Sequence, residues 1–246
     1  MPTLICHVRR RLPVAVVDLA GTLDHTSAAR AMVTLRDCLA DAPTFLLVEC
    51  GHLAVTAPTA LTPLLRLATD VATWPATRIG LCGATPAVRG LVDAHDGTTA
   101  SYASLDDGLA EALSAPVAPK ESLALRADHD SPAVARRFVD EICTSWGIRR
   151  TSKLASLVAS ELVTNAVVHA RTPSVMSLRL AGDVLAITVR DGDPRPMYRP
   201  DPGATGAHDG DHGRGLLILD AMADAWGTLS TADGKVVWAT MSISSA

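Results

Sequence analysis

The residues best suited to chemistry lie in segment 160–170, which reads SELVTNAVVHA. Residues four apart lie only about 40° apart around an α-helix, so Glu161, Asn165 and His169 are predicted to form one polar stripe. The carboxylate could orient or deprotonate a hydroxyl or a water, and the amide oxygen could bind a hard cation beside phosphates. The alternative is an ordinary solvated helix face, on which such a pair is common.

A pair of glycines could bind an anion at the start of a second helix. Gly213 and Gly215 precede an apolar segment that is predicted to be helical from Leu216. Free backbone N–H groups at a helix start attract anions, and glycines allow a ligand to approach closely. The simpler alternative is a turn in which the two glycines bind nothing.

A long segment rich in proline and glycine runs from Asp191 to His212. Loops longer than about 12 to 15 residues inside a compact domain tend to be functional lids or disordered linkers, so we predict a lid here. Its two histidines, His208 and His212, are interpreted as part of a solvated loop, because no predicted strand or helix would fix them as metal ligands.

The composition excludes several classes of protein. The 246 residues carry a net charge of -4, without a run of lysines and arginines that would indicate binding to nucleic acid or a lipid surface. The five cysteines show no CxxC or metal-type spacing, which favours a reduced, cytoplasmic setting. The apolar run after residues 9–11 is too short for a signal peptide, and no stretch reaches the length of a membrane span.

The N-terminal part alternates strand and helix signals, which indicates parallel pairing through crossovers and an α/β domain over residues 1–115. Either Asp24 or Thr26 is expected to cap the first helix. The strand predictions are 12–20, 44–49 and 78–83, and the helix predictions are a segment after residue 24, 60–72 and 105–113.

Two prolines in segment 114–120 (SAPVAPK) indicate a linker, placed at 116–120. Beyond it, the C-terminal domain at 121–246 is predicted to be an α+β sandwich, with helices on one face of a mixed or antiparallel sheet. Its predicted elements are a short strand at 123–125, a helix opened by Ser131 and Pro132, a helix from about residue 151, a hairpin of 175–180 with 184–190, and a last strand at 235–243.

The order of these features resembles the nucleotide site of the GHKL (HATPase) ATPase superfamily, most closely its anti-sigma-factor serine/threonine kinase branch. The segment SELVTNAVVHA resembles the N-box of that family and is the most specific match. The resemblance implies ATP and Mg2+ as cofactors. It also implies that Glu161 is the general base on the substrate hydroxyl, that Asn165 is a magnesium ligand, and that the phosphates are held by Gly213, Gly215 and the backbone of Leu216.

The same resemblance assigns Asp191 as the acceptor for the adenine amino group. A carboxylate at a strand end can accept this N–H and rejects guanine, whose oxygen would face it unpaired. Two departures from the family pattern bear on this pocket. Asp193 and Pro194 follow where a further glycine is usual, and Lys235 and Val236 stand where relatives often place a threonine near the adenine.

The N-terminal part resembles STAS domains, the fold of anti-sigma-factor antagonists, through AGTLDHTSAA and the strands FLLVEC and RIGLCG. In that family a serine at the start of the second helix is phosphorylated. Here Pro58 stands at that point, so the usual switch is expected to be lost. Thr59 could replace it, although a helix-capping threonine is the more economical interpretation.

Two functional hypotheses follow. The first is a cytoplasmic regulator that uses ATP as a serine/threonine protein kinase acting on an antagonist partner of the STAS type. The second is a non-catalytic, nucleotide-dependent module that docks a protein partner in a sigma-factor pathway. The expected partner is a protein in either case, an antagonist or a sigma factor, with no nucleic acid or membrane involved, and a homodimer is left open.

Overall fold

The structure is a computed structural model that describes residues 3–10, 12–70, 74, 77–94, 99–195 and 214–243. It divides into two compact units, Met1–Val117 and Ala118–Ala246. The division falls within the segment 116–120 that was expected to link them. Among the described helices, none has both the length and the apolar character needed to cross a membrane.

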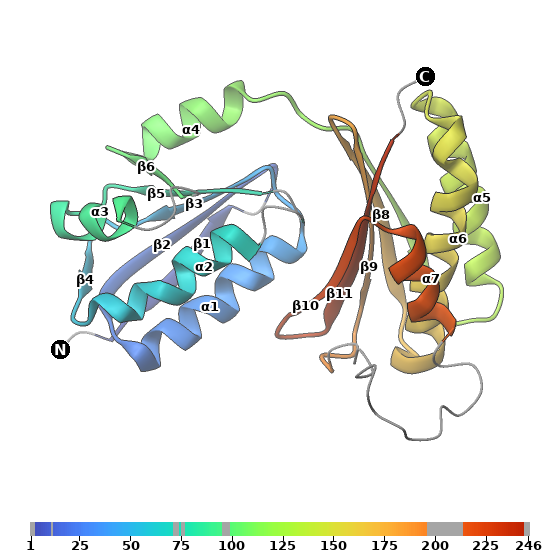
Figure 1. The fold of residues 1–246 in the computed structure, drawn as a ribbon. Helices are drawn as coiled ribbons and strands as arrows, with labels where there is room; N and C mark the ends of the chain where they lie inside the picture. The colour runs from blue at the N-terminus through green and yellow to red at the C-terminus, as the bar shows by residue number, and fades with distance from the viewer. Residues whose placement is uncertain are drawn as a thin grey trace. The chain divides into compact units, whose positions relative to one another are not determined.

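The N-terminal unit is built on one sheet with the strand order β1-β2-β3-β5-β6, and β4 also pairs with β2 (Figure 1). The strands from β2 onward pair in parallel, whereas β1 is antiparallel to β2. The strands are β1 Ile5–Arg10, β2 Val14–Leu23, β3 Phe45–Glu49, β4 Leu53–Val55, β5 Arg78–Cys82 and β6 Ala100–Tyr102.

Helices cover both faces of this sheet, with α1 and α2 on one side and α4 on the other (Figure 1). Asp24 caps α1 through a capping box, in which its carboxylate accepts the Ser27 N–H at 2.7 Å. The α/β class predicted for this unit is confirmed. The helical segments are α1 His25–Ala40, η1 Pro58–Leu61, α2 Thr62–Asp70, α3 Pro86–Asp93 and α4 Leu105–Ser114.

The first predicted strand, 12–20, does not end before Gly21. The strand β2 continues to Leu23, and Gly21 adopts φ +105°, a conformation that favours glycine. A Cβ atom at Gly21 would lie 2.6 Å from the carbonyl oxygen of Thr3. The glycine therefore lets the strand pass close to the N-terminal segment without breaking it.

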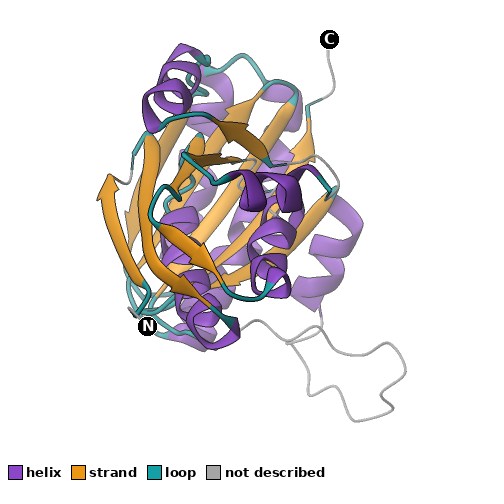
Figure 2. Ribbon diagram, turned by 90° about the vertical axis from the view of Figure 1, so that its left-hand side faces the viewer, coloured by secondary structure: helices purple, strands orange, loops and turns teal. Residues whose placement is uncertain are grey.

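The C-terminal unit is a five-stranded, wholly antiparallel sheet in the order β10-β11-β9-β8-β7, with helices packed on one face (Figures 1 and 2). This confirms the predicted α+β sandwich. Its elements are β7 Lys120–Leu125, α5 Ser131–Ser145, α6 Arg149–Asn165, η2 Ala166–Ala170, β8 Ser174–Ala181, β9 Val184–Asp191, α7 Arg214–Met222, β10 Ala225–Ser230 and β11 Lys235–Ser242.

Alternation along the strands builds the core of this unit. Every second residue of a strand faces the helices, and these positions are apolar and buried over most of β8, β9 and β11. Opposite them, α6 supplies a buried apolar row. The core includes Met176, Leu178, Leu185, Ile187, Val189, Val237, Ala239 and Met241 from the sheet, and Ala155, Val158, Ala159 and Leu162 from α6.

Two local predictions in this unit were wrong. Ser131 does not cap α5, because the Asp128 carboxylate accepts the Ser131 N–H at 3.0 Å while the Ser131 hydroxyl donates to the Arg126 carbonyl. The next helix begins at Arg149, before the expected Thr151 or Ser152.

Candidate functional site

Glu161 and Asn165 lie one turn apart near the C-terminal end of α6, as predicted. The neighbouring residues Leu162 and Val163 are fully buried and hold this side of the helix against the core. Glu161 and Asn165 are themselves half-buried. The helix therefore presents the two polar side chains at the border between the core and solvent.

Burial raises the pKa of the Glu161 carboxyl above its ordinary value. Among the residues that the structure describes, none donates a hydrogen bond to this carboxylate. A carboxylate that is partly removed from water and lacks donors is a better proton acceptor than a free one. Glu161 is thus suited to act as a base.

The polar stripe does not continue to His169 with α-helical spacing. After Asn165 the chain forms a π-helical turn over η2, closed by the Arg171 N–H bonding to the Ala166 carbonyl at 3.0 Å. A π-turn widens the helix, so the i+4 rule that placed His169 on the stripe no longer holds. His169 is exposed in this turn. Single π-turns are frequent at functional sites, which fits the location beside Asn165.

Asp191 is the last residue of β9 and continues the inward-facing row of that strand, so its side chain is only 1% exposed. Lys235 lies directly opposite on β11, and its side chain is 7% exposed. The Lys235 Nζ atom lies 3.0 Å from Asp191 Oδ1 and donates to the Asp193 carbonyl at 3.1 Å. The end of the apolar core is therefore closed by a buried ion pair.

The backbone around this pair is tightly packed. The Asp193 N–H donates to Asp191 Oδ1 at 2.9 Å. The Gly192 N–H donates to the Thr172 hydroxyl at 2.9 Å, which ties the end of β9 to the segment after η2. A Cβ atom at Gly234 would lie only 1.9 Å from the Asp191 carbonyl oxygen. Gly234 therefore lets β11 start close against the end of β9.

Asp193 itself is held by an exposed arginine. Its carboxylate accepts from the Arg195 Nε atom at 2.9 Å and from the second nitrogen of the same guanidinium at 3.0 Å. Hydrogen bonds from Arg195 are the main reason that the pKa of Asp193 is lowered to about 2. The segment that follows Asp191 thus carries a fixed negative charge at neutral pH.

The predicted phosphate-binding residues are only partly described. Gly213 lies outside the described residues, as do His208, His212 and most of the predicted lid. Gly215 and Leu216 lie in the first turn of α7, which begins at Arg214, so Gly215 is inside the helix and not before it. The helix α7 contacts α6, and η2 contacts β9. The elements that carry the predicted residues are therefore neighbours within one unit.

The sequence reasoning noted Lys235 as a departure but missed its ion pair with Asp191. The signal was present in the strand alternation. The inward-facing residues of β9 are 185, 187 and 189, and the next residue in this series is Asp191. The inward-facing residues of β11 are 241, 239 and 237, and the next residue in this series is Lys235.

Among the described residues, no group of three His, Cys, Asp or Glu side chains could hold a metal ion. A magnesium ion at Asn165 would therefore need ligands from phosphate and water.

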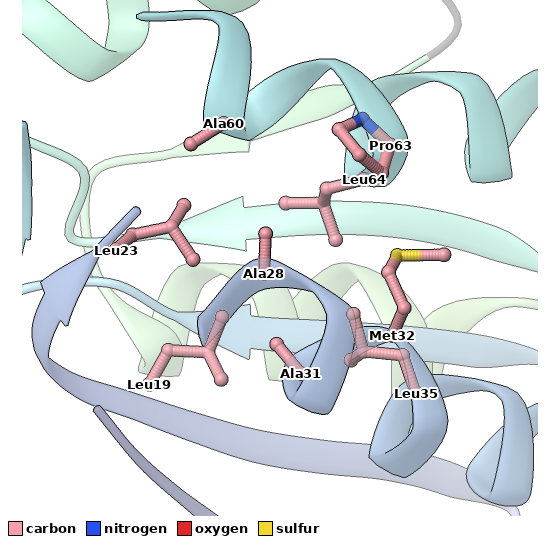
Figure 3. A pocket seen from close by; sticks show the side chains of 9 residues that line it. All are labelled: Leu19, Leu23, Ala28, Ala31, Met32, Leu35, Ala60, Pro63 and Leu64. Atoms are coloured by element: carbon pink, nitrogen blue, oxygen red, sulfur yellow. The ribbon is translucent and has the colours of Figure 1, made fainter. Parts of the chain in front are cut away.

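The N-terminal unit offers less chemistry. The Thr59 hydroxyl does not cap the helix as expected, but lies 3.2 Å from His25 Nε2 at the surface. A small hollow between α1 and the segment η1–α2 is lined only by apolar side chains (Figure 3). Such a lining has no group that could bind or activate a polar substrate.

The comparisons with known proteins agree with the C-terminal geometry. Residues 125–241 match the family model described as the histidine kinase-like ATPase domain. This range covers the end of β7 through β11 and includes Glu161, Asn165, Asp191 and Lys235. The C-terminal unit therefore carries a domain of this family, which confirms the predicted GHKL-type half of the chain. No curated protein matches the sequence.

Three solved structures are similar to parts of the chain. An anti-sigma factor antagonist from Mycobacterium paratuberculosis is 20% identical with a TM-score of 0.37, and covers 45% of this chain and 94% of its own. The anti-sigma factor antagonist SpoIIAA, in its unphosphorylated form, is 14% identical with a TM-score of 0.38, and covers 46% and 99%. The histidine kinase domain of a blue-light activated kinase from Erythrobacter litoralis EL346 is 14% identical with a TM-score of 0.29, and covers 89% and 94%.

Proposed function

We propose that this protein is a cytoplasmic regulator whose C-terminal unit binds ATP with Mg2+ and transfers the γ-phosphoryl group to a serine or threonine of an antagonist protein of the STAS type. The observation that carries the proposal is Glu161, a half-buried carboxylate with a raised pKa, one helical turn from Asn165 in the ATPase domain. In this function Glu161 accepts the proton of the attacking hydroxyl and Asn165 binds the metal ion through its amide oxygen.

The backbone at the start of α7 is suited to the phosphates. The first N–H groups of a helix have no partner within the helix and favour an anion. Gly215 and Leu216 lie in this first turn, and α7 contacts α6, the helix that carries Glu161. Phosphoryl transfer needs chiefly positioning, a metal ion and such donors, with modest help from a base.

The second candidate is a module that binds nucleotide and a protein partner without catalysis. The Asp191 carboxylate favours this candidate, because the Lys235 ammonium already donates to Oδ1, one of the two oxygens that could accept the adenine amino group. Weaker anchoring of the base would leave the nucleotide less well positioned for transfer.

A transfer assay separates the two candidates. The full chain is incubated with labelled ATP, Mg2+ and a panel of purified STAS-type antagonists, and phosphate incorporated into each protein is measured. Glu161→Ala should reduce transfer by at least about 100-fold while ATP binding, measured by calorimetry, is unchanged. The matched control is Glu141→Ala on α5, which removes an exposed carboxylate from the neighbouring helix and should leave both quantities unchanged.

ATP binding without transfer to any antagonist would support the binding module. Absence of ATP binding by the wild-type chain would refute both candidates.

A further inference from the structure

The Lys235 side chain donates a hydrogen bond to Asp191, the residue that is predicted to accept the adenine amino group. Its ammonium donates to Asp191 Oδ1 at 3.0 Å, and the same oxygen also accepts the Asp193 N–H at 2.9 Å. A carboxylate oxygen has two lone pairs, so Oδ1 has its full complement of donors before any ligand binds. A base that reaches this oxygen must compete with a charged donor.

The ammonium itself has one donor that is poorly used. Two of its N–H groups point to Asp191 Oδ1 and to the Asp193 carbonyl. Among the described residues, the remaining polar neighbour is Asp193 Oδ2 at 3.6 Å, which is longer than a good hydrogen bond. The Asp193 carboxylate is held instead by Arg195. The described residues therefore leave one Lys235 N–H donor poorly used, beside an Asp191 oxygen, Oδ1, that already accepts two hydrogen bonds.

We propose that Lys235 is a specificity-determining residue that removes the preference for adenine, so that the site binds adenine and guanine nucleoside triphosphates with similar, weak affinity. The proposal rests on the proposed function, because it concerns the same nucleotide site. Adenine presents an amino donor at the position where guanine presents a carbonyl acceptor. A free Asp191 would favour the first and repel the second, whereas the Lys235 ammonium weakens the first contact and can donate to the second.

Calorimetric titration of the full chain with ATP and with GTP, each with Mg2+, tests this inference. The wild-type affinities for the two nucleotides should differ by less than about threefold. Lys235→Thr removes the ammonium from Asp191 Oδ1 and leaves a shorter, neutral side chain in its place. We expect this variant to bind ATP roughly 10- to 100-fold more tightly, the range of one charge-assisted hydrogen bond, and to bind GTP no better than the wild type.

Arg190→Met is the matched control. Arg190 precedes Asp191 on β9, so its side chain points to the opposite face of the sheet, where it pairs with Asp233 at 3.0 Å. The substitution removes a cation and an ion pair beside the site without freeing Asp191. Its ATP and GTP affinities should equal those of the wild type.

The outcomes distinguish this inference from the proposed function. If the wild-type chain binds ATP at least tenfold more tightly than GTP, the role of Lys235 is overturned, whereas the proposed binding of ATP is not. This measurement does not depend on the folding of a variant. A folded Lys235→Thr variant with unchanged ATP affinity overturns this role as well. If no form of the chain binds either nucleotide, the proposed function fails together with this inference.

Discussion

Replacing Gly234 with alanine tests the packing that holds Lys235 against Asp191. The new Cβ atom would lie 1.9 Å from the carbonyl oxygen of Asp191 and 3.0 Å from its carbonyl carbon. Cβ atoms essentially never approach a heavy atom more closely than 3.0 Å, so the first distance must lengthen from 1.9 Å to at least that value. The obstacle is backbone and cannot rotate away. The start of β11 and the end of β9 must therefore separate.

The size of the effect follows from this geometry. Overpacking a tightly fitted site costs about 1–3 kcal/mol and occasionally more, and a clash with backbone belongs at the upper end. We expect Gly234→Ala to lower the free energy of unfolding of the C-terminal unit by about 3 kcal/mol. The separation of the strands also pulls the Lys235 ammonium away from Asp191, because the two residues are directly paired.

Gly182→Ala provides a control in the same sheet. Gly182 turns the hairpin between β8 and β9 with φ +56°, and a Cβ atom there meets nothing within 4 Å. This substitution adds backbone strain without a clash, at a cost of about 1–2 kcal/mol. The two variants therefore separate crowding from conformational preference.

Urea denaturation of the full chain, followed by tryptophan fluorescence, measures both variants. Three of the four tryptophans, Trp146, Trp226 and Trp238, belong to the C-terminal unit. Midpoints at unchanged slope report the change in stability. If Gly234→Ala unfolds at the same urea concentration as Gly182→Ala or at a higher one, the close approach of β11 to Asp191 is wrong.

Two further substitutions are expected to stabilise the protein. Burial raises the pKa of Glu161, so the folded state holds that proton more tightly than the unfolded state, and the resulting stability is full below the ordinary pKa and lost as pH rises through the raised one. Glu161→Gln should therefore stabilise the chain at pH 7.5 by less than ~1 kcal/mol, since much of the group still faces solvent, and this gain should disappear near pH 4 in urea titrations. The wild-type transfer rate should rise with pH through the same raised pKa, because a base must be deprotonated. Gly90→Ala, within α3 and with nothing near its Cβ position, should stabilise the N-terminal unit by about 1 kcal/mol in the same denaturation assay.

The periodic segments of the sequence were sufficient to predict the main architecture. The helix α6 has a buried apolar row at helical spacing, and β8 and β9 alternate around a glycine turn, so both were found. The strands β4 and β6 have three residues each and carry almost no pattern. The strand β1 alternates apolar with polar residues at the edge of its sheet, where partial exposure hides the signal. The strand β10 follows α7 after two residues and was taken as part of the helical segment.

The candidate site residues could be chosen from the sequence, but their contacts could not. Glu161, Asn165 and Asp191 stand out by type and spacing, and the family match covers all three. The π-turn at η2 depends on how the chain leaves α6, which an α-helical spacing rule cannot express. The Asp191–Lys235 pair depends on the register between β9 and β11, two strands separated by more than forty residues. A one-residue shift of that register would place Lys235 on the other face of the sheet.

The two carboxylates of the candidate site, Glu161 and Asp191, differ in the hydrogen-bond donors around them. No described residue donates to Glu161, whereas Asp191 accepts from both an ammonium and a backbone N–H on one oxygen. A buried ion pair contributes little net stability compared with apolar residues of similar size, whereas removing one partner leaves the other charge buried and unpaired. In the proposed function, a base without donors favours transfer, and a saturated acceptor weakens recognition of adenine. Transfer and base recognition should therefore respond to different variants: changes at Glu161 should alter the rate at saturating ATP, and changes at Lys235 should alter the concentration of ATP needed for saturation.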